Sequence, residues 1–91
     1  MYNLQFLKSA IIQLDELRNG DRKSYLKIFE LTLAIIQNPR DGIGKPERLK
    51  GYGEHEFYSR KINEKDRLVY QIVELERLII LISCKGHYLD R

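Results

Sequence analysis

HEFYSRKINEKDRLVYQIVELERLIILIS, residues 55–83, is the stretch that decides the fold. Residues 55–62 and 67–73 flank the polar turn 63–66, a pattern typical of a β-hairpin. Residues 78–83 are apolar on both faces, which favours a buried strand in the centre of a sheet. The sequence therefore predicts three consecutive strands in its second half.

The first half of the chain predicts one strand and two helices. Apolar and polar residues alternate through residues 2–7, as in a half-buried strand. A short helix is expected from Ser9, its N-cap, to Gly20. Asp21 caps a second helix, which ends before Pro39 because the residue preceding proline disfavours the helical region. The link between the helices is short, so we expect an antiparallel helical hairpin.

The order β-α-α-β-β-β indicates a single α+β domain over residues 1–91. Its simplest packing is an antiparallel sheet with the helical hairpin on one face. The other face is expected to stay partly open and to carry the polar side chains that alternate outward: Ser59, Lys61, Arg67 and Gln71.

Composition excludes several classes of protein. The chain has 91 residues, 43% of them hydrophobic and 32% charged, with a net charge of +3, which is ordinary for one small globular domain. The longest wholly apolar run, residues 78–82, is far shorter than the roughly 20 residues of a membrane-spanning helix. The N-terminus does not resemble a signal peptide, and a single cysteine, Cys84, excludes an internal disulfide. We therefore expect a cytoplasmic protein without membrane contact, in which Cys84 is a small buried residue.

Motifs for nucleotide, metal or serine-nucleophile chemistry are missing from the sequence. With two histidines and one cysteine, neither a metal site nor a cofactor is expected. A different set of side chains remains, mostly after the long irregular stretch 38–54. Each member alone also fits an ordinary role in solubility, packing or helix initiation. The set consists of Lys45, Glu47, Lys50, Arg60, Lys61, Arg67, His87 and Tyr88.

Taken together, these residue types suit cleavage of RNA, which carries its own nucleophile in the 2′-hydroxyl. Such cleavage needs a base, an acid and cations that offset charge on the five-coordinate phosphorus. We assign Glu47 as the base and His87 as the acid, with Arg67 and Lys61 binding the phosphate. Stacking on an unpaired base suits Tyr88. Lys50 and Arg60 are expected to contact the RNA backbone. This scheme requires no metal.

Four short pieces carry a resemblance to a known family. They are GIGKPERLK at 42–50, FYSRKI at 57–62, DRLVY at 66–70 and SCKGHY at 83–88. In this order they resemble the YoeB/Txe branch of the RelE–ParE toxin superfamily. The resemblance implies the RelE-like α+β fold of that superfamily, with the same order of elements.

The resemblance also implies a function. It implies the toxin of a type II toxin–antitoxin system, a ribosome-dependent endoribonuclease that cleaves mRNA in the ribosomal A site. The partners implied are the ribosome, mRNA and a cognate antitoxin similar to YefM or Axe, with an acidic C-terminal segment. Operator DNA is then contacted only through the antitoxin. A monomer and a homodimer both remain open.

Family roles map onto individual positions of this chain. The glutamate base falls on Glu47, the phosphate-binding arginine on Arg67, and the C-terminal His-Tyr pair on His87 and Tyr88. A basic residue of the family falls on Lys50. Two departures are visible. Tyr58 replaces a tryptophan, and Lys61 replaces an arginine, which keeps the charge but loses the planar fork that binds phosphate at two points.

Two other functions are compatible with the composition. The chain could be a non-catalytic toxin similar to ParE, which acts by binding gyrase, although that branch lacks the acid–base set. It could also be an interaction module without toxicity, in which basic residues complement an acidic antitoxin peptide.

Overall fold

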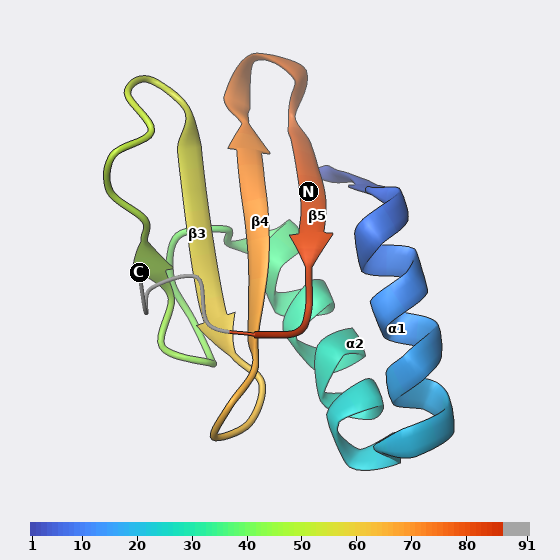
Figure 1. The fold of residues 1–91 in the computed structure, drawn as a ribbon. Coiled ribbons are helices and arrows are strands. Elements are labelled where there is room, and N and C mark those ends of the chain that lie inside the picture. Colours follow the sequence, from blue (N-terminus) through green and yellow to red (C-terminus); the bar gives the residue numbers. More distant parts are fainter. Residues whose placement is uncertain (87–91) are drawn as a thin grey trace.

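A computed structural model describes residues 1–86, where two α-helices cover one face of a five-stranded sheet (Figure 1). The sheet order is β1-β5-β4-β3-β2. The elements are β1 (Asn3–Phe6), α1 (Lys8–Gly20), α2 (Arg22–Gln37), β2 (Glu47–Arg48), β3 (Glu56–Lys61), β4 (Arg67–Val73), the 3-10 turn η1 (Glu74–Glu76) and β5 (Leu78–Ser83). The predicted α+β fold with a helical hairpin on one face is confirmed.

The pairing of β1 is the one that differs from the predicted antiparallel sheet. The neighbours β2–β3, β3–β4 and β4–β5 are all antiparallel, as expected. β1 instead runs parallel to β5, with Asn3 opposite Leu78 and Phe6 opposite Leu81. Alternation of apolar residues reports which face of a strand is buried and carries no information about the direction of its neighbour. The sheet is therefore mixed, with one parallel edge.

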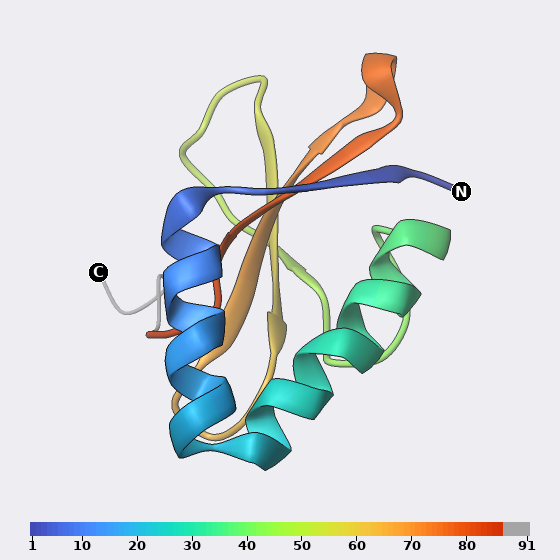
Figure 2. The same ribbon diagram turned by 90° about the vertical axis from the view of Figure 1, so that its right-hand side faces the viewer.

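The core lies between the sheet and the helical hairpin, whose helices α1 and α2 diverge from their short link (Figure 2). Ile28, Leu31 and Ile35 of α2 are spaced three and four residues apart and are at most 2% exposed. They form one cluster with Tyr70 of β4 and Ile79 of β5, both fully buried. Within residues 1–86, no helix covers the opposite face of the sheet, which leaves it available for a site.

The two helix starts are built differently. The prediction that Ser9 caps α1 is wrong, because the helix begins at Lys8 and its N-cap is Leu7, without a side-chain bond. The Ser9 hydroxyl instead donates to the Ile82 carbonyl at 2.7 Å. The prediction for α2 is confirmed: Asp21 accepts from the Ser24 N–H at 3.2 Å.

Arg60 organises the loop between α2 and β2 from inside the protein. Its Nε donates to the Tyr70 hydroxyl at 3.0 Å. Its two Nη groups donate to three loop carbonyls at 2.8–3.0 Å: those of Asn38, Asp41 and Ile43. A buried charge is tolerated when its donors are satisfied in this way. The loop that leads to Glu47 is thus fixed by one guanidinium.

Two further expectations concern Cys84 and the membrane. Cys84 is 2% exposed, as predicted, and burial raises the pKa of its thiol to about 11. Within residues 1–86, neither helix has the length and apolar character needed to cross a bilayer.

Candidate active site

Side chains from three strands meet on the uncovered face of the sheet. Glu47 of β2 lies opposite Ser59 of β3, and Lys61 of β3 lies opposite Arg67 of β4. Successive side chains of a strand point to opposite faces, so Ser59 and Lys61 share a face with their partners. The same register places the core residues Tyr70 and Leu68 on the helix side. Four polar side chains therefore lie together near the β2 edge.

Glu47 and Arg67 form the centre of this group. Oε1 of Glu47 is 3.7 Å from Nη2 of Arg67, although nineteen residues separate them in sequence. The Arg67 side chain is only 10% exposed, whereas that of Glu47 is 54% exposed. The guanidinium thus forms the floor of the site, and the carboxylate stands beside it in contact with solvent.

The Arg67 guanidinium is held by hydrogen bonds on two of its nitrogens. Nε donates to the Ser59 hydroxyl at 2.9 Å, and Nη2 donates to the carbonyls of Lys45 at 3.2 Å and Ser59 at 3.4 Å. Lys45 has a left-handed backbone with φ 51, which is costly for a residue with a side chain. Within residues 1–86, Nη1 makes no hydrogen bond, so its N–H donors can bind an anion.

The lysines lie around this centre. Lys61 is directly opposite Arg67, and its Nζ is 3.1 Å from Glu64, a carboxylate that is 94% exposed. Such exposed ion pairs contribute about 0–1 kcal/mol, so Lys61 can exchange this partner for a phosphate. Lys50 is exposed and lies three residues after Glu47.

Arg60 is not part of this group, and the expectation that it contacts RNA is corrected here. It lies between Ser59 and Lys61 in β3, so its side chain points to the helix face, where it is 0% exposed. Its donors are already bonded to the Tyr70 hydroxyl and the loop carbonyls described above. Arg60 supports the loop before Glu47 and has no surface on which to bind a substrate.

His87 and Tyr88 lie outside the described residues. The last described residue, Gly86, accepts a hydrogen bond through its carbonyl from the backbone N–H of Arg67 at 3.2 Å. His87 follows Gly86 directly in the sequence.

Two contacts of the site were missed by reasoning from the sequence: those of Arg67 with the Ser59 hydroxyl and with the Lys45 carbonyl. Ser59 lies two residues before Lys61, and this spacing alone placed it on the open face. Its bond to Arg67 carries no sequence signal, because the two residues are brought together only by the pairing of β3 with β4. The Lys45 carbonyl is a backbone group and is invisible in residue types.

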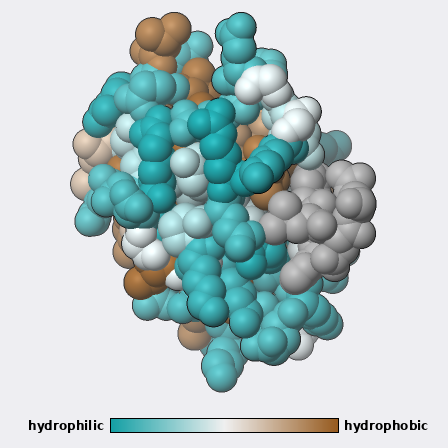
Figure 3. Space-filling view, turned by 90° about the vertical axis from the view of Figure 1, so that its left-hand side faces the viewer, coloured by the Kyte–Doolittle hydropathy of each residue, from teal (hydrophilic) through white to brown (hydrophobic). Residues whose placement is uncertain are grey.

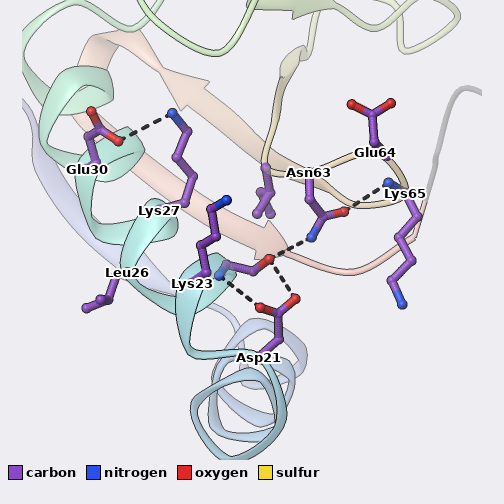
Figure 4. A pocket seen from close by; sticks show the side chains of 10 residues that line it. Asp21, Lys23, Leu26, Lys27, Glu30, Asn63, Glu64 and Lys65 are labelled. Carbon is purple, nitrogen blue, oxygen red and sulfur yellow. Dashed lines mark hydrogen bonds and ion pairs between the residues drawn. The ribbon is translucent and has the colours of Figure 1, made fainter.

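The surface around the site is hydrophilic, whereas a large cavity lies elsewhere. The β2–β3 side of the protein is mostly polar (Figure 3). A cavity of about 910 Å³ lies between α2 and the β3–β4 turn, and neither Glu47 nor Arg67 lines it (Figure 4). Within residues 1–86, no three His, Cys, Asp or Glu side chains are grouped as metal ligands. An open polar face suits an extended polymer better than a small molecule.

Chemically, the arrangement combines a carboxylate with a guanidinium at one place. A solvent-contacting carboxylate can accept a proton, and a fixed guanidinium can stabilise charge that develops on a phosphate. Both functions are needed for phosphodiester cleavage by an internal hydroxyl.

Comparison with known proteins gives consistent matches. The family model described as YoeB-like toxin of bacterial type II toxin-antitoxin system matches residues 6–88. Toxin YoeB of Synechocystis sp. is 44% identical over 71 residues, which cover 78% of this chain and 79% of that protein. A YoeB dimer from Staphylococcus aureus superposes with a TM-score of 0.83 at 39% identity, covering 96% of this chain and 98% of that one. A heterotetrameric YoeB-YefM complex from the same species gives a TM-score of 0.79 at 38% identity, with 97% and 99% coverage.

Proposed function

The chain belongs to the YoeB-like toxins of bacterial type II toxin–antitoxin systems, and from this premise we propose that it is a ribosome-dependent endoribonuclease that cleaves mRNA in the A site. The observation that carries the proposal is the contact between Glu47 and Arg67 at 3.7 Å on the open face of the sheet. It brings a potential base and a phosphate-binding group within reach of one nucleotide linkage.

The reaction is a transesterification in which the RNA supplies the nucleophile. Glu47 accepts the proton of the 2′-hydroxyl, and the 2′-oxygen forms a bond to phosphorus while the bond from phosphorus to the 5′-oxygen breaks. Arg67 stabilises the negative charge on the non-bridging oxygens. His87 donates a proton to the departing 5′-oxygen. The products are a 2′,3′-cyclic phosphate and a 5′-hydroxyl.

The surrounding residues bind the RNA. Lys61 lies opposite Arg67 and adds a second positive charge to the phosphate site. Lys50 contacts the RNA backbone from the segment after β2, and Tyr88 stacks on a base. Stacking of this kind contributes about 1–3 kcal/mol per base in nucleic-acid sites.

The same open face offers a place for an antitoxin. Acidic side chains of an extended segment would pair with Lys61 and Arg67 and exclude RNA. The Staphylococcus aureus relative is described in complex with YefM and as a dimer, so we propose a YefM-like partner and a homodimer for this chain. Operator binding is assigned to the antitoxin.

The test measures cleavage of a defined mRNA with and without programmed ribosomes. Cleavage at the A-site codon is expected only with ribosomes, and His87→Ala is expected to slow it at least tenfold. The matched control is His55→Ala, which removes the chain's other histidine. Wild-type cleavage by His87→Ala would refute the assigned acid. Inhibition of gyrase supercoiling without RNA cleavage would favour the ParE-like function instead.

A further inference from the structure

The carboxylate of Asp66 is buried next to the candidate active site. Asp66 is the last residue of the turn before β4 and is 4% exposed. Its Oδ1 accepts from the backbone N–H of Gly86 at 3.0 Å, and its Oδ2 accepts from Nδ2 of Asn63 at 3.1 Å. Both oxygens are thus used by donors inside the protein. Burial of a carboxylate is costly, so its bonds here offset a large desolvation penalty.

Two adjacent residues hold both polar groups of the Gly86 backbone. The Asp66 side chain binds its N–H, and the backbone N–H of Arg67 binds its carbonyl at 3.2 Å. The Arg67 side chain meanwhile lies 3.7 Å from Glu47. One dipeptide therefore links the base, the phosphate-binding group and the backbone immediately before His87.

Asn63 fixes the direction of the Asp66 carboxylate. The Asn63 oxygen accepts from the backbone N–H groups of Lys65 at 2.9 Å and Asp66 at 2.8 Å. Its Nδ2 must therefore face the Asp66 carboxylate and the Ser24 hydroxyl, to which it donates at 2.7 Å. Figure 4 shows Asn63 between the start of α2, where Asp21 lies, and the turn that carries Lys65. The Asn63 amide therefore connects the Asp66 carboxylate to Ser24 at the start of α2.

Helix α1 supports the preceding stretch 82–85 from another direction. Ser9, Gln13 and Glu16 lie on one helical face, four and three residues apart. Oε1 of Gln13 accepts from the backbone N–H of Cys84 at 2.8 Å, and the other two side chains contact residues 82 and 85. Residues 82–85 therefore lie along α1 and lead to Gly86, whose backbone is bound by Asp66 and Arg67.

We propose that Asp66 is a positioning residue for RNA cleavage, which seats Gly86 so that the following residue, His87, reaches the phosphate bound by Arg67. The proposal rests on the function proposed above, in which His87 is the acid. A carboxylate is required because two donors, from Gly86 and Asn63, converge on it. An amide offers one oxygen and would turn its own N–H₂ toward one of these donors.

The test distinguishes misplacement of the acid His87 from a general loss of activity. Programmed ribosomes carry an mRNA with either an ordinary linkage at the A-site codon or one in which sulfur replaces the bridging 5′-oxygen. When the phosphorus–sulfur bond breaks, the electron pair leaves on sulfur as a thiolate, which needs no proton from an acid. Asp66→Asn is expected to slow single-turnover cleavage at least tenfold on the ordinary linkage. On the sulfur linkage it is expected within about threefold of wild type, because general acid catalysis is worth about 10²–10⁴-fold only where it is needed.

Two comparison variants serve as controls for this experiment. Glu47→Gln removes the base and is expected to stay slow on both linkages. Asp15→Asn changes an exposed carboxylate of α1 and is expected to match wild type on both. If Asp66→Asn is equally slow on both linkages, or cleaves the ordinary linkage at the wild-type rate, the positioning role is overturned.

His87→Ala distinguishes failure of this inference from failure of the proposed function. His87→Ala is expected to cleave the sulfur linkage at close to the wild-type rate. If it does not, the assignment of His87 as the acid is wrong, and the positioning role falls with it. If His87→Ala recovers and Asp66→Asn does not, only the positioning role is wrong.

Gly86→Ala gives a second approach that leaves the carboxylate in place. Gly86 has φ +88, which disfavours alanine, while a Cβ there would meet no atom within 4 Å. The substitution therefore strains the Gly86 backbone without a clash. Like Asp66→Asn, it is expected to slow cleavage of the ordinary linkage and to leave cleavage of the sulfur linkage close to the wild-type rate. This variant decides the question if Asp66→Asn does not fold, and wild-type cleavage of the ordinary linkage by Gly86→Ala would then overturn the proposal.

Discussion

Removing one oxygen atom with Tyr70→Phe tests whether Arg60 is a structural residue. Tyr70 is 0% exposed, and its hydroxyl accepts from Nε of Arg60 at 3.0 Å while donating to the Pro39 carbonyl at 2.7 Å. Burial raises the pKa of Tyr70, so the phenol keeps the proton that it donates. Phenylalanine fills the same space and leaves one buried donor and one buried acceptor without their partner.

The magnitude follows from these two bonds. A hydrogen bond to a charged group contributes about 1.5–3 kcal/mol and a neutral one about 0.5–1.5 kcal/mol. We therefore expect Tyr70→Phe to lower the free energy of unfolding by about 2–4 kcal/mol. In a domain of this size each kcal/mol lowers the Tm by about 4–8 °C.

Urea unfolding followed by circular dichroism measures this loss, with Tyr58→Phe as the matched control. The half-buried ring of Tyr58 stacks on Tyr70 at 6.0 Å between centroids, and removing its hydroxyl is expected to cost less than about 0.5 kcal/mol. Equal, small losses for the two variants would refute the claim that the buried guanidinium organises the loop through Tyr70.

The remaining predictions concern the loop glycine and acid stability. Gly44→Ala is expected to cost more than Gly51→Ala in urea unfolding, because both have positive φ (+83 and +91) but only the Cβ at Gly44 would lie 2.7 Å from a Leu31 methyl; equal losses would contradict the packing. Arg40 bonds hold the pKa of Glu56 below its ordinary value of 4.5, so the folded state binds this proton less tightly than the unfolded chain. The ion pair therefore stabilises the folded state above the ordinary pKa, and this stabilisation is lost as pH falls through the lower pKa of the folded state. Glu56→Gln should flatten the fall in the free energy of unfolding measured at pH about 5 to 3. An unchanged dependence on pH would rule the pair out.

The strands that carry the site could be predicted because their pattern is simple. Period-two alternation in β3 and the apolar run of β5 predict strands at these positions, although the central strand of the sheet is β4 and β5 lies between it and β1. The contact between Glu47 and Arg67 could be expected only from the family resemblance, since nineteen residues lie between them. Their proximity depends on β2, a two-residue strand that is too short to leave a pattern.

Arg60 and the helix surfaces show why other features could not be predicted. The alternation that places Ser59 and Lys61 outward also places Arg60 inward, but its charge argued for solvent. Only the tertiary structure supplies the carbonyls that satisfy it. In α1, Ile11 and Ile12 are 54% and 52% exposed, although an apolar pattern predicts burial.

The rate constant of Glu47→Gln for single-turnover cleavage on programmed ribosomes tests the central claim most directly. The side chain is 54% exposed, so its replacement leaves the fold intact, and Glu54→Gln, another exposed carboxylate, serves as the control. Loss of the base is expected to slow cleavage by about 100-fold or more, with the control unchanged. A rate within about threefold of wild type would show that the carboxylate beside Arg67 does not accept the proton of the 2′-hydroxyl.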